Sequence, residues 1–360
     1  MKVLHLDEQP GWRGGEQQAS WLLQGLARQG HSVLIAGRPG SRFLTSGHGG
    51  AELQRLALPF RGEWDLVTAV RLASALKTRS IDILHAHTSH VHTTALLARF
   101  LAGRGKVIVS RRVSFPPKRN PLNRWKYRLP DRIIAVSQEV GRVLRDSGLD
   151  EDRIAVVHSA VDLARLDVPP MPRSDLGVPQ GVPLLVSAGA LVGHKDHANL
   201  LAALPQVHTA FPEARLLIAG EGEQRPKIEA QIAALDLQGR VTLLGHRGDA
   251  PRLIRAGDVY VSSSWSEGLG TSILEALACR TPVVATEAGG AAEMIRPGQT
   301  GFLVPCRNAD ALAQAIIQCL SRREEARAMA ERGRRLVQEE FVTDRMVAGT
   351  LRIYQEVLES

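Results

Sequence analysis

Residues 259–279 read VYVSSSWSEGLGTSILEALAC, and this stretch decides the fold. Its first four residues are apolar almost throughout, which favours a short buried strand. Gly268 and Gly270 then allow a tight turn, and the residues as far as about Cys279 have the spacing of a helix. A buried strand that turns through glycines into a helix is the repeating unit of an open, parallel α/β sheet.

The same alternation of apolar runs and helical patterns occurs on both sides of this stretch. Runs that are apolar almost throughout suit strands covered on both faces. In the first half they span residues 3–6, 33–36, 81–84, 106–109, 133–136 and 154–157, with helical spacing at 16–29, 65–78, 91–101 and 138–147. In the second half they span 184–187, 215–219, 241–243, 259–262, 283–285 and 302–304. The sequence therefore predicts an α/β protein with two successive doubly wound domains.

A proline-rich segment separates the two halves. Five prolines and two glycines crowd residues 169–183 without any long periodic pattern. We therefore expect a first domain at residues 1–168, a linker at 169–183 and a second domain at 184–342. Residues 343–358 form one amphipathic helix, which either covers the second domain or returns to pack on the first. We expect this helix to pack on the first domain.

The composition limits the class of protein. The chain has 360 residues, 44% of them hydrophobic, which suits two domains with real cores and excludes wholesale disorder. Three scattered cysteines indicate reduced thiols and a cytoplasmic location rather than a disulfide framework. Asp7 and Glu8 interrupt the first apolar run, so no signal peptide is expected. No apolar run approaches the ~20 residues of a membrane-spanning helix.

The net charge of +8 is concentrated in one segment. Residues 104–130 carry nine Lys or Arg and no Asp or Glu, so the rest of the chain is close to neutral. Aromatic residues lie among these basic residues, but the segment contains no nucleic-acid-binding motif. A nucleic-acid-binding protein is therefore disfavoured.

The glycine turn after residue 262 is suited to binding a phosphate. Gly268 and Gly270 leave backbone N–H groups unshielded at the start of a helix, where the helix dipole adds partial positive charge. Thr271 and Ser272 are expected to cap this helix and to offer hydroxyls. The alternative is an ordinary structural turn between a strand and a helix.

Charged side chains flank the same turn. Glu275 lies within the first turns of the helix, where it would accept hydrogen bonds from vicinal hydroxyls such as those of a ribose, and Glu267 would face a second polyol. Residues 189–196 form another glycine-rich loop after a strand. Its Lys195 would add a cation to the same crevice, because ligands of open α/β sheets gather at the carboxyl ends of the strands. The alternative is a solvated lysine.

In the first half, two features follow predicted strands. The loop GWRGGEQ at residues 11–17 lacks the dinucleotide-binding fingerprint, but Gly14 and Gly15 permit the close approach of a ligand. His85 and His87 lie on one face where a strand ends. A metal site is an alternative, although no carboxylate or cysteine accompanies these histidines. We favour a hydrogen bond from His87 to a bound sugar and assign His85 to the core.

Together these motifs resemble the family-4 retaining glycosyltransferases, whose GT-B fold consists of two Rossmann-like domains. The segment EGLGTSILEALACRTPVVATEAGG resembles the family's Glu-x7-Glu motif, with Glu267 and Glu275 at the two glutamates. DILHAHTSH resembles the family's first-domain strand that ends in histidine, with His87 at the matching position. IIAVSQEV and VVHSAVDL are similar to its last two first-domain strands, and the helix around Tyr354 is similar to its crossover helix. The resemblance covers nearly the whole chain.

The resemblance implies retaining, metal-independent transfer of a sugar from a nucleotide-sugar donor to a cell-envelope glycan or glycolipid of the lipopolysaccharide or exopolysaccharide type. No cofactor is implied. The second domain would hold the donor, and the acceptor would enter a cleft between the domains. The residues implied to act in catalysis are His87, Lys195 and Glu267. The implied donor-binding residues are Gly14, Gly15, Gly189, Lys195, Glu267, Gly268, Leu269, Gly270, Thr271 and Glu275.

One position departs from the family pattern. The family usually has an arginine after the glycine of its phosphate loop, and Ala190 stands there in this chain. His194 or Arg247 is the candidate to replace the missing cation. A nucleotide-sugar epimerase or a phosphorylase on the same fold is the alternative function.

The basic segment lies in the half that would meet the acceptor. It is either a solvated loop, a site for anionic lipid head groups at about 1 kcal/mol per basic residue near the surface, or a site for a phosphorylated acceptor. We predict peripheral association with the inner face of the cytoplasmic membrane. The expected contact residues are Arg111, Arg112, Lys118, Arg119, Arg124, Trp125, Lys126 and Arg128, with Phe115, Leu122, Tyr127 and Leu129 as apolar groups.

Overall fold

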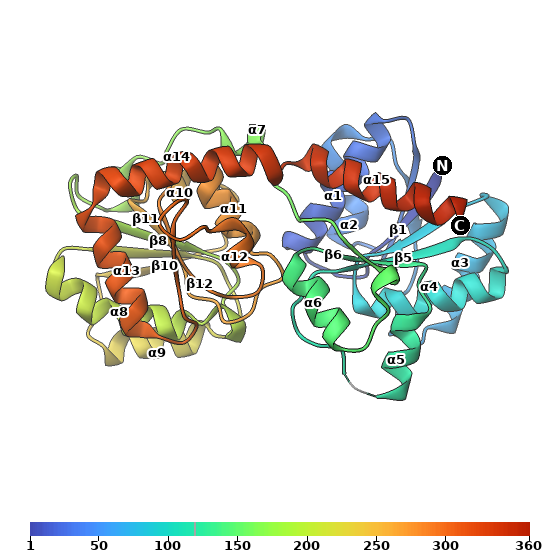
Figure 1. Ribbon diagram of the computed structural model, residues 1–360, viewed down its shortest axis with the longest axis horizontal. Helices are drawn as coiled ribbons and strands as arrows, with labels where there is room; N and C mark the ends of the chain where they lie inside the picture. The colour runs from blue at the N-terminus through green and yellow to red at the C-terminus, as the bar shows by residue number, and fades with distance from the viewer. Residues whose placement is uncertain (119) are drawn as a thin grey trace. The chain divides into compact units, whose positions relative to one another are not determined.

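The chain folds into two units, each built around one parallel sheet (Figure 1). The computed structural model describes residues 1–118 and 120–360, apart from the side chain of residue 124. Unit 1 comprises residues 1–160 and 343–360, and unit 2 comprises residues 161–342. The α/β class with two Rossmann-like domains is therefore confirmed.

Unit 1 contains a seven-stranded sheet with the order β3-β2-β1-β4-β5-β6-β7. Its strands are β1 (Lys2–Leu6), β2 (Ser32–Gly37), β3 (Gln54–Ala57), β4 (Ile83–Ala86), β5 (Lys106–Arg111), β6 (Arg132–Ala135) and β7 (Ile154–Val156). Its helices are α1 (Gly14–Arg28), α2 (Arg42–Thr45), α3 (Leu66–Thr78), α4 (Ser89–Ala102), α5 (Pro121–Arg128), α6 (Gln138–Asp146) and α15 (Thr343–Glu359). The strand order reverses between β1 and β4, which is where open α/β sheets bind ligands.

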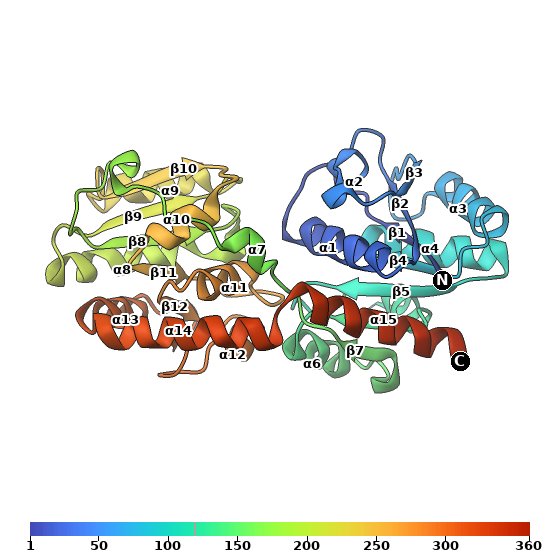
Figure 2. The same ribbon diagram turned by 90° about the horizontal axis from the view of Figure 1, so that it is seen from above.

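Helices cover both faces of the sheet in unit 1. Leu23 of α1 and Tyr354 of α15 belong to the apolar cluster on one face, and Leu72 of α3 and Leu96 of α4 belong to the cluster on the other. Helices α3 and α4 lie side by side (Figure 2). Because both faces are covered, the central strands such as β1 and β4 are buried almost throughout.

The terminal helix α15 packs on α1 in unit 1. The two helices approach closely at Gly25, where a Cβ would lie 2.3 Å from Cγ2 of Val347. The hydroxyl of Tyr354, further along α15, lies 2.5 Å from Nδ1 of His85. This helix therefore completes unit 1, although 182 residues of unit 2 precede it in the chain.

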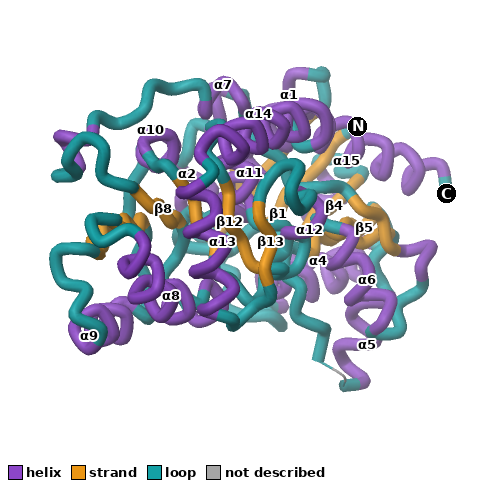
Figure 3. The backbone as a smooth tube through the Cα atoms, turned by 60° about the vertical axis from the view of Figure 1, so that its left-hand side comes forward, coloured by secondary structure: helices purple, strands orange, loops and turns teal. Residues whose placement is uncertain are grey.

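Unit 2 contains a six-stranded sheet with the order β10-β9-β8-β11-β12-β13. Its strands are β8 (Leu184–Ala188), β9 (Arg215–Ala219), β10 (Val241–Gly245), β11 (Val259–Ser262), β12 (Val283–Thr286) and β13 (Phe302–Val304). Its helices are α7 (Leu163–Leu166), α8 (His197–Ala210), α9 (Arg225–Ala234), α10 (Ala250–Ala256), α11 (Thr271–Ala278), α12 (Ala291–Met294), α13 (Ala309–Ser321) and α14 (Arg323–Glu340). One face of this sheet packs against α10, α11 and α14, and the other face packs against α8, α9 and α13 (Figure 1). Strands β12 and β13 lie side by side in the sheet (Figure 3).

The boundary between the units differs from the sequence prediction. The chain divides after Ala160, and the proline-rich residues 169–183 are part of unit 2 rather than a linker. Met171 and Val178 are buried in the core of unit 2, and Arg173 forms an ion pair with Asp258 at 2.8 Å. Prolines favour an extended chain, but the apolar residues between them fix this segment to the sheet.

Strand β3 and helix α5 are among the elements that were not predicted from the sequence. Strand β3 has a polar sequence because it lies at the edge of the sheet, where most of its residues are exposed. Helix α5 lies within the basic segment, where Oδ1 of Asn120 accepts a hydrogen bond from the backbone N–H of Asn123 at 2.8 Å. Within the described part of the chain, every helix is too short or too polar to cross a membrane.

Candidate active site

The glycine turn of unit 2 leads from β11 into α11 without a side-chain cap. Gly270 occupies the N-cap position with a φ of 95°, a conformation that favours glycine. Thr271 is the first helical residue, and no side chain of the described residues caps α11. The prediction that Thr271 and Ser272 cap this helix is therefore wrong, because the glycine before them takes the capping position. The first N–H groups of α11 have no side-chain acceptor in the turn.

Lys195 and Glu267 form an ion pair above this turn. Nζ of Lys195 lies 2.5 Å from Oε1 of Glu267, and the same oxygen accepts a hydrogen bond from Oγ of Ser264 at 2.6 Å. The side chains of Lys195 and Glu267 are only 19% and 10% exposed. The stem of Lys195 lies over Gly189, with Cε 3.4 Å from the place of a Cβ there. The predicted cation, Lys195, and one of the two motif glutamates, Glu267, therefore lie in one site with little exposure to solvent.

Backbone contacts hold the loops of this site together. The backbone N–H of Trp265 donates to the carbonyl of His194 at 2.9 Å, and Oγ of Ser263 donates to the carbonyl of Lys195 at 3.0 Å. These bonds join the loop after β8 to the loop after β11. Because β8 and β11 are neighbours in the sheet, both loops leave the same edge.

A third loop, after β12, contributes a glycine that sequence reasoning missed. Gly289 has a φ of 54°, and a Cβ at this position would lie 1.8 Å from the carbonyl oxygen of Glu267. The backbone N–H of Gly290 donates to the carbonyl of Gly268 at 3.3 Å. Two adjacent glycines in the loop after a predicted strand were the signal that could have indicated this position. They position the backbone of the turn that carries Glu267.

Glu275 lies one turn inside α11 with a half-buried side chain. Burial raises the pKa of its carboxyl group above the usual range, and the nearby Arg165 opposes this shift. Among the described residues, none donates a hydrogen bond to this carboxylate. Glu275 is thus a half-buried acceptor without a protein partner.

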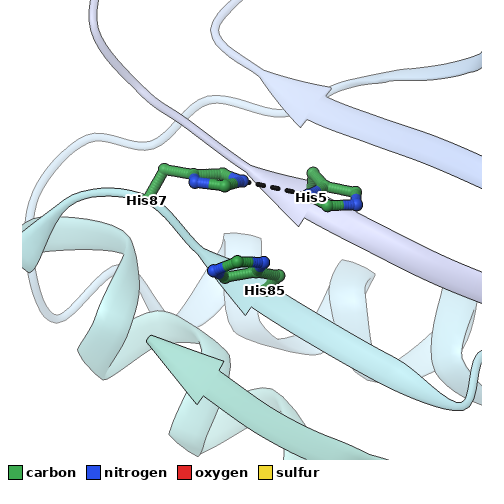
Figure 4. Close-up of side chains that lie close together, drawn as sticks. All are labelled: His5, His85 and His87. Carbon is green, nitrogen blue, oxygen red and sulfur yellow. Dashed lines mark hydrogen bonds between the residues drawn. The ribbon is translucent and has the colours of Figure 1, made fainter. Parts of the chain in front are cut away.

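In unit 1, three histidines lie together at the carboxyl ends of β1 and β4 (Figure 4). His5 and His85 are paired residues of these two strands, and His87 stacks on His5 with an interplanar angle of 9°. His85 is fixed in the core by Tyr354 through Nδ1 and by Ser110 through Nε2, the latter at 2.8 Å. His85 is thus a core residue, as the sequence predicted.

Hydrogen bonds within unit 1 already engage His87. Its Nε2 lies 2.9 Å from Nδ1 of His5, and its Nδ1 lies 3.3 Å from Nη2 of Arg112. One nitrogen of each of the three imidazoles lies within 4.8 Å of the others, as a metal site would require. However, Nε2 of His5 is the one ring nitrogen of the three that lacks a partner among the described residues, and a guanidinium lies beside the cluster. The geometry favours a hydrogen-bonded network over a metal centre.

Burial shifts the pKa values of the titratable groups in this network. It lowers the pKa of His5 to about 3 and lowers that of His87 well below the usual range, so both are neutral at pH 7. Burial and the nearby Glu16 raise the pKa of Asp7 to about 8. Burial also lowers the pKa of Arg112 to about 10, against the attraction of Asp7 and Glu16.

Gly14 and Gly15 begin α1 beside this network. The place of a Cβ on Gly15 lies 3.5 Å from Cδ of Arg112, so the helix start packs over the Arg112 side chain. Oε2 of Glu16 accepts a hydrogen bond from the backbone N–H of Arg13 at 2.6 Å. The acid in the first turn reduces the attraction of this helix start for an anion.

Several residues predicted to form a membrane or acceptor surface lie inside unit 1 instead. Lys126 is buried and pairs with Glu63 and the carbonyl of Ser89. Arg112 faces His87, and Arg111 donates to the hydroxyl of Tyr127 at 2.8 Å. The ring of Tyr127 in α5 also packs edge-on against His92 of α4. The prediction of a surface role is wrong for Lys126, whose side chain is buried.

The exposed part of the basic segment is smaller than predicted. Lys118 and Arg128 are exposed, and so is Trp125, at 46%. Arg119 and the side chain of Arg124 lie outside the described residues.

Two family models match the chain. The model of glycosyl transferases group 1 matches residues 172–336, and that of Glycosyltransferase Family 4 matches residues 12–165. The lipopolysaccharide core biosynthesis mannosyltransferase LpcC of Rhizobium leguminosarum bv. viciae is 32% identical over 65% of this chain and 67% of its own. The chain is a family-4 glycosyltransferase of group 1.

Further comparisons show similarity over nearly the full length of this glycosyltransferase. The lipopolysaccharide core biosynthesis glycosyltransferase LpsE of Rhizobium meliloti is 26% identical over 92% of this chain and 93% of its own. The structure of HepE from Anabaena in complex with UDP is 22% identical and has a TM-score of 0.85. The superposition covers 99% of this chain and 100% of HepE, which confirms the GT-B fold.

Arg247, a candidate to replace the arginine that the family has at the position of Ala190, is already paired in this glycosyltransferase. The guanidinium of Arg247 is bound by Asp249 at 2.7 and 2.8 Å and also contacts the sulfur of Met171. Its charge is therefore already balanced within unit 2. Ala190 leaves Lys195 as the predicted phosphate-binding cation of this loop.

Proposed function

We propose that this glycosyltransferase moves a sugar from a nucleoside diphosphate sugar to a glycan or glycolipid of the cell envelope, with retention of anomeric configuration and without a metal ion or other cofactor. The observation that carries the proposal is the site in unit 2 where Lys195, Glu267 and the start of α11 lie on loops joined by hydrogen bonds. UDP and UDP-glucose in HepE structures support the donor class. The names of LpcC and LpsE support a lipopolysaccharide-type acceptor.

Each group of the unit 2 site has a role toward the donor. The ammonium of Lys195 and the N–H groups after Gly268 would bind the diphosphate, since both attract anions. The carboxylate of Glu275 has no protein partner and would accept hydrogen bonds from the ribose. Glu267 would accept from the sugar while it keeps Lys195 in position. The donor thus replaces water around groups that the protein has already oriented.

The reaction needs no side-chain nucleophile. The bond between the anomeric carbon and the phosphate oxygen breaks, and the acceptor oxygen bonds to that carbon on the same face. The acceptor's hydroxyl proton passes to the leaving phosphate oxygen. Lys195 and the start of α11 stabilise the charge that develops on the phosphate. His87, neutral at pH 7, would orient the sugar by exchanging its long contact with Arg112 for a sugar hydroxyl.

We also propose that the protein acts in the cytoplasm at the inner face of the membrane. Lys118 and Arg128 are exposed basic residues, and the exposed apolar side chains of Leu122 and Trp125 lie near them on α5. Such a mixture favours binding to anionic lipid. Co-sedimentation with phosphatidylglycerol vesicles should exceed that with phosphatidylcholine vesicles and weaken with salt. Equal binding to both lipids would contradict this location.

The experiment that tests the function is a donor screen followed by turnover. Thermal shifts with UDP-, GDP-, ADP- and CDP-sugars identify the donor, and turnover is then measured with lipopolysaccharide and lipid-linked acceptors. We expect one donor class to stabilise the protein, transfer in the presence of EDTA, and a product with the donor's anomeric configuration by NMR. Binding of no nucleotide sugar, together with full activity of Lys195→Ala and Glu267→Ala, would contradict the proposal.

The same assay separates the alternatives on this fold. An epimerase converts the donor without an acceptor, and a phosphorylase depends on inorganic phosphate. The glycosyltransferase should require a second, hydroxyl-bearing substrate and no phosphate. Donor conversion in the absence of any acceptor would favour an epimerase.

A further inference from the structure

A cavity in unit 1 lies at the carboxyl edge of the sheet. It has a volume of about 280 Å³ and is lined by loops that follow β1, β2 and β3 and by the start of α4. These strands stand in the order β3-β2-β1-β4, so the cavity spans the place where the strand order reverses. The edge and the reversal are where an open α/β sheet binds ligands.

Positive charge dominates the rim of this cavity. Arg38 follows β2, Arg61 follows β3, and His90 lies in the first turn of α4. The side chains of Arg38 and Arg61 are exposed, and within the described residues no carboxylate forms an ion pair with either of them. Two guanidinium groups from separate loops therefore converge on one cavity with their donors available.

The acidic residue of the cavity forms its hydrogen bonds with neutral groups rather than with these arginines. Glu8 is buried, and one of its oxygens accepts a hydrogen bond from Oγ1 of Thr88. The other oxygen accepts from Nε2 of Gln9 at 2.6 Å. Both oxygens of Glu8 are thus used by neutral donors that fix the floor of the cavity.

The loop that carries Arg61 is held in a strained conformation. Phe60 has a φ of 41°, which is rare for a bulky residue, and its side chain is buried. Its backbone N–H donates to Oγ1 of Thr68 at 3.2 Å, and that hydroxyl donates to Oδ2 of Asp65 at 2.7 Å. Oδ2 of Asp65 also accepts from the backbone N–H of Arg61 at 2.9 Å. The start of α3 therefore fixes the position from which Arg61 extends.

We propose that this cavity binds an anionic group of the acceptor, a phosphate or a carboxylate, with Arg38 and Arg61 as the cations that recognise it. A planar guanidinium matches the two oxygens of either group. His90 would supply a further hydrogen bond at the rim. The inference rests on the proposed function, because the donor's phosphates are assigned to unit 2 and an anion site in unit 1 is then left for the acceptor.

Anion binding by the full-length protein tests the site directly. Inorganic phosphate and succinate are titrated at matched ionic strength, with thermal stability as the readout. The variants are Arg38→Gln, Arg61→Gln and the double substitution. Arg71→Gln is the matched control, because Arg71 is an exposed cation of α3 that does not line the cavity.

We expect at least one anion to stabilise the wild type and the control equally, and the double variant to bind it at least tenfold more weakly. The anion that binds more tightly identifies the group as phosphate or carboxylate. With the acceptor that carries this group, the double variant should raise KM at least tenfold and change kcat less than threefold. Equal stabilisation of the wild type and the double variant, or of neither, would overturn the proposal.

Titration of the same samples with UDP, GDP, ADP and CDP distinguishes failure of this proposal from failure of the proposed function. The double variant should bind the same nucleotide as the wild type, with an affinity within a factor of two. Loss of anion binding with intact nucleotide binding supports the acceptor site. If anion binding follows the expected pattern but no sample binds any nucleotide, the donor assignment in unit 2 fails and the cavity is no longer assigned to an acceptor.

Discussion

Nζ of Lys195 lies 2.5 Å from Oε1 of Glu267, so the cation and one of the two motif glutamates bind each other across two loops of unit 2. Both side chains are mostly buried, and a charge in such a place needs its partner. The pair keeps each group oriented before a donor arrives. A bound diphosphate would then interact with a Lys195 ammonium that Glu267 already holds in position.

The first prediction concerns this ion pair. Glu267→Gln keeps the size of the side chain but leaves Lys195 without an ionic partner. We expect a loss of stability of about 1–3 kcal/mol and a fall in kcat of at least 100-fold. Urea denaturation and turnover measure these effects. Glu287→Gln, an exposed acid of the next loop, should change neither quantity.

A double-mutant cycle with Lys195→Met isolates the interaction. The double variant should be more stable than the sum of the single losses, because removing both charges leaves neither one unpaired. Strict additivity of the two losses would show that the observed contact contributes nothing to stability.

The second prediction concerns Gly289. A Cβ at this position would lie 1.8 Å from the carbonyl oxygen of Glu267, so Gly289→Ala must displace the turn. We expect donor affinity to fall at least tenfold, with a loss of stability of about 2–4 kcal/mol. Gly298→Ala is the control, since Gly298 also has a positive φ but faces open space. Equal effects of the two substitutions would assign the loss to backbone strain alone.

The sequence predicted the fold well where burial determined it. The apolar runs at residues 184–187 and 259–262 are β8 and β11, since a strand covered on both faces leaves a clear pattern. Strand β3 has no such pattern, because an exposed edge tolerates polar residues. The proline-rich segment misled the domain boundary, because composition does not show that Met171 reaches the core of unit 2.

The candidate site was predictable only in part, for a related reason. Glycines, glutamates and a lysine after strands indicated the unit 2 site, because parallel strands bring their carboxyl ends to one edge. The contact between Lys195 and Glu267 spans 72 residues, and no local pattern encodes it. Similarly, charge alone placed Lys126 on the surface, whereas its partner Glu63 lies in a distant loop.

The third prediction concerns the docking of α15. Gly25→Ala places a methyl group 2.3 Å from Cγ2 of Val347 and should push α15 away from α1. We expect a loss of stability of about 2–4 kcal/mol and faster hydrogen exchange in residues 343–359. Gly47→Ala is the control, because a Cβ there meets no atom within 4 Å. Unchanged hydrogen exchange in α15 would show that the helix accommodates the added methyl group without becoming less stable.

The fourth prediction restores the cation that the family pattern contains. Ala190→Arg adds a guanidinium to the loop that carries Lys195. We expect UDP to bind about tenfold more tightly, since a charge-assisted hydrogen bond contributes about 1.5–3 kcal/mol. Calorimetric titration with UDP measures the change, and Ala190→Gln separates charge from size. Equal affinity in all three proteins would show that the diphosphate does not reach residue 190.

The last prediction is the pH dependence of unit 1. The pKa of His5 falls from 6.5 to about 3 on burial, so below pH 6.5 the unfolded chain binds a proton that the folded chain does not. Stability therefore falls as the pH falls through this window, by about 2 kcal/mol at pH 5 from His5 alone. Burial lowers the pKa values of His85, His87 and His92 in the same direction. Unit 1 should thus lose stability steeply in acid.

Asp7 gives this profile its upper limit. Its pKa is raised from 3.8 to about 8, so its contribution is present in acid and is lost as the pH rises toward 8. Above pH 6.5 the histidines no longer oppose this loss, and stability should decline gently between pH 6.5 and 8. Urea denaturation at pH 5.0, 6.5 and 8.0, with hydrogen exchange in β1 and β4 reporting on unit 1, measures both slopes. Asp7→Asn should abolish the decline above pH 6.5 and make the acid limb steeper, because Asp7 opposes the histidines between about pH 4 and 6.5. An unaltered profile would show that Asp7 does not carry its proton in the folded protein.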